Sequence, residues 1–559
     1  MEESTVVIVG AGPSGLALGA LLGRMNTKVI ILERDTEVCE DPRGIVVNGD
    51  AVRISYQIGI GEGLTKRIGK DIGVLNFHRG SFRTSPFMTF DINVDWAKQS
   101  VSNNVTQFQP NYEREIRALL PSFPSVELRT GCEVFSRREH EESESTVVGY
   151  RTLDGQEDFI RTWWLVGADG KRGVVRKKFL EPEGVRQEDG AWTYVGTWVA
   201  INLKITTPTP DSHPEFPLWK LGWTPERVHD LFWPSGFHFC NDSRRPSVSG
   251  RFGPPGSGFW RHEYSVEPTD DLSDCEGQFW SLFSPWMVIP GSAISNALRG
   301  TQVEFPSDCI QVIRCRPFTF ATKIVNKWFS NRTMLIGDAA HVFPPFGGQG
   351  IATGIRDAQS LAWRLTVMSR MGVGKEDKLV YNHQSCPEGF FIGDKGGGKK
   401  LAQIWVRRLG EAPQLSDSAF LRDLSGLSLL VLVRDRENRT TVEDVERLIK
   451  QADLPEGLLR MENVTFYHIH GRTADNVVMK DEEARHQDEG AADYYPCSAA
   501  ELLTEGIKPI QGYDWTAVQD QLGPRANLVL LRPDFFVHSA ASTVDEMAAN
   551  LRVVREYFV

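Results

Sequence analysis

The first 33 residues contain the pattern that most restricts how this chain can fold. A short run of mostly β-branched residues, Thr5–Val9, ends at a glycine and is typical of a buried parallel strand. The segment Ser14–Met25 is rich in Leu, Ala and Gly and predicts a closely packed helix, and Lys28–Leu32 is a second apolar run. This strand–helix–strand unit predicts an α/β protein.

Three glycines, Gly10, Gly12 and Gly15, lie between the first strand and the helix. Glycine lets the backbone turn tightly and approach a pyrophosphate, while the helix N-terminus presents free N–H groups and the positive end of its dipole. Glu33 ends the second strand, where a carboxylate can accept both ribose hydroxyls of an adenosine. Its charge would repel a 2′-phosphate, so FAD or NAD is expected rather than NADP. A glycine-rich turn that binds no nucleotide is the alternative.

A second motif begins with the apolar run Trp163–Val166, which leads into Gly167-Ala168-Asp169-Gly170. Basic residues follow it at Lys171, Arg172 and Arg176. On its own this pattern also fits an ordinary strand-to-loop turn. It gains meaning only together with the other two motifs.

The third motif is the most specific. An apolar run, Met334–Ile336, leads into Gly337-Asp338, and an acid directly after a strand can bind a ribose or ribityl hydroxyl. The chain then passes through the Gly-rich loop that ends at Ile351 and enters a helical run, Ala352–Leu365. The N-terminus of that helix could face an electron-rich flavin edge and stabilise the negative charge of reduced flavin.

Composition and charge argue against several classes of protein. A net charge of −11 disfavours a general binder of nucleic acid or of anionic membranes. The 8 cysteines are scattered without a CxxC pair, which disfavours a zinc site and a redox pair, so no metal is predicted. The apolar stretch Leu424–Val433 is too short to span a bilayer, and Met1–Thr5 lacks the basic start of a secretory signal. A cytoplasmic protein is therefore expected.

In this order, the three motifs resemble those of the flavoprotein aromatic hydroxylases of the para-hydroxybenzoate hydroxylase superfamily. The resemblance covers nearly the whole chain and is strongest to the subgroup with phenol hydroxylase and 3-(3-hydroxyphenyl)propionate hydroxylase-like enzymes. It implies FAD as cofactor, NADH or NADPH and O₂ as co-substrates, and hydroxylation of a phenolic or polyketide-derived aromatic through a flavin C4a-hydroperoxide. A Baeyer–Villiger oxygenase or epoxidase on the same fold, and a non-catalytic FAD-binding protein, remain alternatives.

The family's FAD-contacting residues can be carried over where its motifs match. They are Gly10, Gly12, Gly15, Glu33, Arg43, Gln109, Asp169, Gly337, Asp338, Gly348, Gly350 and Ile351. By the same resemblance, Pro345 lies in the loop that lines the flavin ring. Asp50 follows a segment that meets the active site in this family and is a candidate base for deprotonating a phenol, with the cap of a following helix as its alternative. His238 is a second candidate, with a satisfied core histidine as its alternative, and His341 is expected to order the flavin loop.

The resemblance also implies the organisation of the chain. A Rossmann-like FAD-binding domain would comprise residues 1–75, 100–185 and 320–380, and an inserted, mostly antiparallel substrate-binding sheet residues 76–99 and 186–319. A linker at 381–412 and a thioredoxin-like domain at 413–559 would complete the chain. The tail Leu530–Asp534 looks like that domain, which often lies at a subunit interface, so a homodimer is one expectation. Two features depart from the family: Gly173 replaces a serine, and the segment after Leu365 is shortened.

Overall fold

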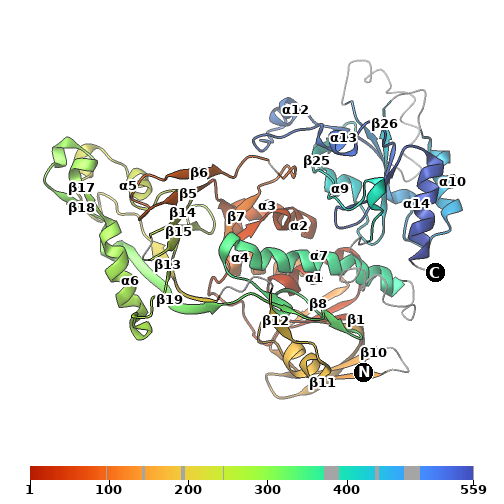
Figure 1. The fold of residues 1–559 in the computed structure, drawn as a ribbon, viewed down its shortest axis with the longest axis horizontal. Coiled ribbons are helices and arrows are strands. Elements are labelled where there is room, and N and C mark those ends of the chain that lie inside the picture. The colour runs from red at the N-terminus through yellow and green to blue at the C-terminus, as the bar shows by residue number, and fades with distance from the viewer. Residues whose placement is uncertain are drawn as a thin grey trace.

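The computed structural model describes residues 1–95, 97–140, 145–190, 195–242, 245–370, 390–434, 440–470 and 492–557. Within this part of the chain, three large sheets of eight, seven and seven strands dominate the fold. Figure 1 shows the first sheet at the lower centre, the second to the left, and the third, formed by the C-terminal residues, at the upper right. Two long helices, α1 (Pro13–Arg24) and α7 (Gln349–Arg370), lie between the first and third sheets.

The first sheet has a parallel centre. Its central strand is β1 (Glu2–Val9), and its order is β21-β22-β11-β1-β2-β8. The parallel partners are β2 (Val29–Leu32), β11 (Glu157–Gly167), β22 (Thr333–Leu335) and β8 (Val126–Arg129). Val6, Val7 and Ile8 have no exposed surface, since protein covers both faces of the sheet. This double burial explains the unbroken apolar run of the first strand. The predicted strand–helix–strand unit is confirmed.

Smaller elements extend this region. The strands β9 (Cys132–His140) and β10 (Ser145–Thr152) pair antiparallel and attach to β11. A three-stranded sheet, β3 (Val46–Asn48), β7 (Asn104–Gln107) and β4 (Gly69–Asp71), leads into the helices α2 (Asp50–Ile58) and α4 (Gln109–Leu119). These elements carry several of the predicted cofactor residues.

The second sheet has the order β19-β13-β16-β15-β14-β5-β6. Its strands are β19 (Ile310–Phe320), β13 (Gly196–Ile205), β16 (Phe259–Ser265), β15 (Ser247–Phe252), β14 (Phe237–Cys240), β5 (Val74–His78) and β6 (Met88–Asp91). All neighbours pair antiparallel except β14 and β5, which are parallel. An aromatic cluster fills one face beneath α5 (Pro225–Phe232) and α6 (Cys275–Phe283). The predicted antiparallel sheet in the Trp- and Phe-rich middle of the chain is confirmed.

The third sheet has the order β25-β24-β28-β27-β26-β29-β30. Its strands are β25 (Gln414–Leu415), β24 (Trp405–Arg407), β28 (Ala492–Pro496), β27 (Val464–His468), β26 (Ser428–Val433), β29 (Leu528–Leu531) and β30 (Val537–Ala541). The helices α10 (Val442–Ala452) and α14 (Val544–Glu556) pack against it.

The region predicted as a linker is more ordered than expected where the structure describes it. Strand β24 lies inside the expected 381–412 segment yet belongs to the third sheet. Phe390 is fully buried, and the amide of Ile392 donates to the carbonyl of His538. The glycine content of this segment suggested a solvated linker. Backbone hydrogen bonds instead join part of it to the third sheet. The shortened segment noted after Leu365 falls mostly on residues 371–389, which lie outside the described residues.

Among the described residues, no helix has both the length and the apolar character that crossing a membrane would need.

A buried ion pair joins α2 to the C-terminal region. Arg53, with 4% of its side chain exposed, makes two hydrogen bonds to Asp417, at 2.7 Å from Nε and 2.5 Å from an Nη atom. It also donates to the carbonyl of Leu401 at 2.8 Å and lies over the ring of Phe535. Arg53 is buried, so water cannot take the place of these partners. Its guanidinium group therefore couples α2 to the C-terminal region.

Replacing Arg53 with alanine should therefore lower the free energy of unfolding by about 3–5 kcal/mol, because Asp417 would keep a buried charge without its partner. Urea denaturation followed by tryptophan fluorescence would measure the loss. Arg67→Ala is the matched control, since Arg67 binds Glu115 with the same two-pronged geometry but is 60% exposed. Equal effects of the two substitutions would contradict the coupling role of Arg53.

Candidate functional site

The turn after β1 is set by close backbone contacts. Gly10 has a φ of +104°, and a Cβ added there would lie 2.6 Å from the carbonyl oxygen of Ala168. A Cβ at Gly15 would lie 2.0 Å from the carbonyl oxygen of Gly10. Gly12 differs, because a Cβ there would meet no atom within 4 Å. No side chain caps the start of α1, whose first residue is Pro13. The turn therefore leaves open space in front of uncapped helix N–H groups, as an anion site requires.

The third motif converges on this turn. A Cβ at Gly337, whose φ is +59°, would lie 2.5 Å from Oγ of Ser14 in α1. A Cβ at Gly354 in α7 would lie 2.1 Å from the same Oγ. The hydroxyl of Ser14 thus lies in the space that two glycines leave free. The N-terminal turn and the Gly337 turn therefore lie side by side.

An acid follows each of three parallel strands of the first sheet: β2, β11 and β22, with β1 lying between β2 and β11. Glu33, after β2, accepts the amides of Ala11 at 2.6 Å and Asp35 at 3.0 Å, so it lies against the glycine turn. Asp169 follows β11, and Asp338 follows β22. The carboxyl ends of parallel strands share one edge of a sheet, which is where α/β proteins bind nucleotides.

Two of these acids have raised pKa values. Burial raises the pKa of Asp169 to about 6, against hydrogen bonds from backbone amides such as that of Val175. One Asp169 oxygen, Oδ1, is buried without a hydrogen-bond partner in the structure. Asp338 is exposed, yet desolvation by the surrounding protein raises its pKa against the nearby cations of Lys171 and Arg43. Polar atoms in such positions have capacity left to bind a ligand.

The departure at Gly173 has a local explanation. A Cβ at this position would lie 2.1 Å from both Cγ and Oδ1 of Asp169. The carboxylate of Asp169 therefore occupies the space that the family's serine would need. The substitution changes a side-chain contact and leaves the backbone turn intact.

A second group of predicted residues meets beside α4. The amide of Gly44, next to Arg43, donates to Oε1 of Gln109 at 2.9 Å, and Gln109 donates to Glu113 at 2.8 Å. A Cβ at Gly44 would lie 2.4 Å from the side chain of Ile351. Burial raises the pKa of Glu113 to about 6, and Glu33 adds to this effect. These contacts bring Arg43, Gln109 and Ile351 together, although they come from three distant parts of the sequence.

The Gly-rich loop is held from both sides. The carboxylate of Asp357 in α7 accepts the amide of Gly337 at 2.9 Å and lies 2.7 Å from Nε2 of His341. On the other side, Asn48 donates to the carbonyl of Gly347 at 2.5 Å, and a Cβ at Gly348 would lie 2.9 Å from Val46. His341 is buried and thus takes the loop-ordering position expected of it. Pro345 is exposed within this loop, and a Cβ at Gly350 would meet nothing within 4 Å.

Asp50 is paired with two cations and is not free to accept a proton. It is the first residue of α2, whose N-cap is Gly49, so Asp50 is not the helix cap either. Its carboxylate binds Nε of Arg356 at 2.5 Å and also the ammonium of Lys400. Burial would raise the pKa of Asp50, but these two cations outweigh it and hold the pKa below its usual value. A carboxylate stabilised in this way is a weak base.

His238 does not reach this site. Side chains alternate between the two faces of a strand, and His238 is buried on the face that carries the aromatic cluster, near Phe82 and Trp260. Its Nδ1 lies 3.1 Å from Nε2 of His78, and its Nε2 lies 3.1 Å from the carbonyl of Ser235. Burial lowers its pKa to about 4. The structure therefore places His238 as a satisfied core histidine, which corrects its assignment as a catalytic candidate.

The opposite face of the second sheet carries charged residues that the sequence analysis did not single out. Arg261 donates to the carbonyls of Pro42 at 2.8 Å and Arg43 at 3.0 Å, and Arg314 pairs with Asp41 at 2.6 Å. Arg261 also contacts Glu263, whose pKa is raised by burial. The alternating charged residues Arg261 and Glu263 of the internal strand β16 were the available signal, because buried charged residues are rare unless they are paired.

Comparison with known proteins agrees with this geometry. The family model described as FAD binding domain matches residues 3–221 and 293–386. A probable NADH-specific resorcinol 4-hydroxylase of Rhodococcus jostii is 26% identical over 390 residues, covering 68% of this chain and 61% of that protein. A 3-(3-hydroxy-phenyl)propionate/3-hydroxycinnamic acid hydroxylase of Burkholderia cenocepacia is 27% identical over 365 residues, covering 65% and 57%. The alignments thus span about 60% of the length of these curated relatives.

Solved structures share the fold. Aklavinone-11 hydroxylase, crystallised with FAD and aklavinone, aligns with a TM-score of 0.66 at 17% identity, covering 100% of this chain and 99% of that one. The p-nitrophenol 4-monooxygenase of Pseudomonas putida DLL-E4 aligns with a TM-score of 0.53 at 21% identity, covering 68% and 83%. With the family model matching more than half of its residues, the chain belongs to the FAD binding domain family.

Proposed function

We propose that this protein is an FAD-dependent monooxygenase that uses NADH or NADPH and O₂ to hydroxylate a phenolic or polyketide-derived aromatic. The observation that carries the proposal is the meeting of the glycine turn, the Gly337 turn and α7 around the hydroxyl of Ser14. This contact places two helix N-termini and three acids at one edge of one sheet. A single elongated dinucleotide needs such an arrangement, because its adenosine and its ring system bind at opposite ends.

The residues present fit FAD at several points. The Gly10–Gly15 turn and the uncapped start of α1 would hold the pyrophosphate, and Glu33 and Arg43 would hold the adenosine side. Gln109, which meets Ile351 at Gly44, would contact the flavin side. Asp169 and Asp338 would bind hydroxyls of the ribityl chain or ribose. The loop backbone at Gly348, Gly350 and Ile351, where Gly350 has open space in front of it, and the exposed Pro345 would lie along the ring system. When bound, FAD would supply the redox chemistry, taking up a hydride from the nicotinamide and delivering one oxygen atom of O₂ to the substrate.

The chain's own residues would position the reactants and exclude water. Arg261 and Arg314 fasten the second sheet to Asp41–Arg43, beside the proposed adenosine contacts, so the sheet is held against the FAD-binding region. Asp50 holds Arg356 in the second turn of α7, next to the Gly-rich loop. We assign Asp50 as a positioning residue and not as the base, because its two cations keep it ionised. Excluding water from the site protects the reactive intermediates of the reaction from hydrolysis.

The C-terminal sheet is assigned a thioredoxin-like fold and a structural role. Parallel strands β26, β27 and β28 beside antiparallel β29 and β30 support this assignment. The tail segment Leu530–Asp534 reaches the FAD-binding region, where Asp534 accepts from Trp363 of α7 at 3.3 Å and the carbonyl of Pro533 accepts from Gln57 at 2.8 Å. The C-terminal domain would stabilise α7 through these contacts. A homodimer formed through the same domain is also proposed.

The purified protein should be yellow and should oxidise NADH or NADPH faster when a suitable phenol is added. Screening a panel of phenols by absorbance of the nicotinamide, with product masses, tests this directly. A ring-hydroxylated product gains one oxygen atom and keeps its carbon skeleton. An inserted ester oxygen or an epoxide would favour the Baeyer–Villiger or epoxidase alternative. A protein that is folded but colourless, and that binds no added FAD, would contradict the proposal.

The open space at Gly12 gives a sharper test of the cofactor site. Gly12 has an ordinary φ of −76°, so Gly12→Ala should fold normally while its methyl group enters the space assigned to the pyrophosphate. FAD binding, measured by flavin fluorescence quenching, should weaken at least about tenfold, or ~1.4 kcal/mol. Gly15→Ala is the matched comparison and should destabilise the fold itself, because its methyl group would overlap a backbone oxygen. Wild-type FAD affinity in a folded Gly12→Ala protein would argue against the assigned site.

The role of Asp50 predicts a particular pH dependence. Its lowered pKa means that Asp50 is ionised throughout about pH 6–9, so Asp50→Asn should reduce kcat by a similar factor, roughly tenfold, at every pH in that range. A missing base would behave differently, because the loss would shrink as the pH approached the phenol's own pKa of about 10. Steady-state pH profiles separate the two outcomes. Asp71→Asn, at an exposed position of β4, serves as the control.

A further inference from the structure

A cluster of His213, Asp308 and Cys309, none of them among the proposed FAD contacts, lies beside the second sheet where β13 ends and β19 begins. The strands β13 and β19 pair antiparallel, with Ile205 opposite Ile310, so the loop after one strand meets the turn before the other. The amide of Thr206 donates to the carbonyl of Cys309 at 2.9 Å and fixes this meeting. Residues that are about a hundred positions apart in sequence are thereby held side by side.

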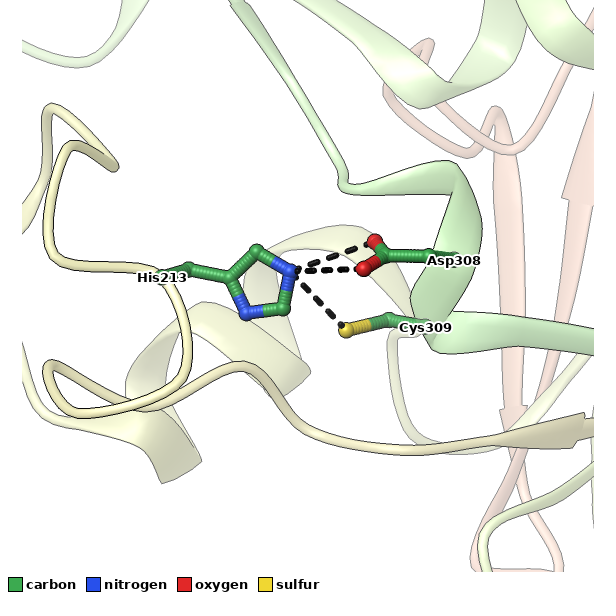
Figure 2. A group of neighbouring side chains, drawn as sticks. All are labelled: His213, Asp308 and Cys309. Atoms are coloured by element: carbon green, nitrogen blue, oxygen red, sulfur yellow. Dashed lines mark hydrogen bonds and ion pairs between the residues drawn. The ribbon is translucent and has the colours of Figure 1, made fainter.

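One nitrogen atom lies at the centre of the cluster. Nε2 of His213 is 3.1 Å and 3.3 Å from the two carboxylate oxygens of Asp308 and 3.8 Å from the sulfur of Cys309. Figure 2 shows the ring of His213 directing this nitrogen toward both other side chains. A single N–H points along one line and cannot donate well to a carboxylate and a thiol at once. An ion lying between the three groups would satisfy all of them.

The separations from Nε2 of His213 are close to those around a tetrahedral zinc ion. With Zn–N and Zn–O bonds near 2.0–2.2 Å and Zn–S near 2.3 Å, ligand atoms should lie about 3.3 Å apart for N and O and about 3.6 Å apart for N and S. The observed separations of 3.1–3.3 Å and 3.8 Å differ from these values by only a few tenths of an ångström. Once the Cys309 thiol has released its proton, the thiolate and the carboxylate also balance the charge of a divalent cation.

The surroundings of the histidine fit a ligand role. Nδ1 of His213 lies 2.9 Å from Oγ of Ser212, which in turn lies within hydrogen-bond distance of Thr209. A partner on the second ring nitrogen fixes the tautomer that leaves Nε2 free for a metal. Cys309 is buried, while Asp308 has 76% of its side chain exposed. The site therefore has a fixed inner side and an open side through which an ion and a fourth ligand, such as water, can reach it.

We propose that His213, Asp308 and Cys309 form a Zn²⁺ site that joins the two loops at the end of the second sheet. A nitrogen, an oxygen and a sulfur ligand together favour zinc over magnesium or calcium, which prefer oxygen alone. The spacing rule used on the sequence could not detect this site, because only Asp308 and Cys309 are neighbours in the chain. The site is independent of the proposed FAD chemistry and would act by stabilising the sheet.

Metal binding by the full-length, FAD-containing protein tests this proposal. After dialysis against a chelator, Zn²⁺ is titrated in competition with a chromophoric chelator, and Co²⁺ is used as a spectroscopic substitute. One Zn²⁺ per chain with a Kd below about 1 µM is expected. Co²⁺ should give the strong visible bands of a tetrahedral site at red wavelengths, where oxidised flavin does not absorb. Absence of Zn²⁺ binding, or a weak six-coordinate Co²⁺ spectrum, would overturn the proposal.

Variants locate the metal. His213→Ala and Cys309→Ser should each weaken Zn²⁺ binding at least about tenfold and remove the tetrahedral Co²⁺ spectrum. Asp308→Asn should weaken binding as well, and because Asp308 is exposed, the variant should keep the wild-type fold, which circular dichroism would check. Cys315→Ser, farther along β19, and Asp211→Asn, in the same loop, are the matched controls and should bind as the wild type does. Binding that is unchanged in all three ligand variants would place the metal elsewhere and refute the assignment.

Discussion

The hydroxyl of Ser14 lies where two glycines, Gly337 and Gly354, bring their backbones against the first helix. Each glycine would place a Cβ closer than van der Waals contact to this oxygen, so α1, the Gly337 turn and α7 can meet only because these positions lack side chains. The rest of the FAD-binding region depends on this contact. It aligns two helix N-termini at one sheet edge and thereby determines where a dinucleotide can lie.

The second sheet depends on a different kind of contact. Its aromatic face buries residues such as Trp233 and Trp260 in a core of its own, while its other face reaches the FAD-binding region through Arg261 and Arg314. Buried guanidinium groups are costly unless they are bonded, and here backbone carbonyls and Asp41 provide the partners. Because these bonds are directional, they hold the second sheet in one orientation relative to the FAD-binding region. Apolar packing alone would define that orientation less precisely.

A similar division of roles applies to the carboxylates. At Asp169 and Glu113, burial outweighs the nearby arginines and raises the pKa values to about 6. Asp50 is partly buried between Lys400 and Arg356, and these two cations outweigh burial and lower its pKa. The same residue type is therefore poised to exchange protons in one place and fixed as an anion in the other. Position relative to charged neighbours decides the difference, and those neighbours come from remote parts of the chain.

The sequence by itself determined the elements and motifs whose causes are local. Apolar runs predicted β1 and β2, and glycine spacing predicted the turn at Gly10–Gly15, because strand burial and backbone sterics act over a few residues. Only the tertiary structure decided which face of β14 His238 would occupy, that Trp405–Arg407 would join the third sheet, and that Asp50 would bind Lys400. It also decided that His213 would meet Cys309. These outcomes depend on strand register and long-range packing, where a shift of one residue turns a side chain to the opposite face, and no local spacing records that choice.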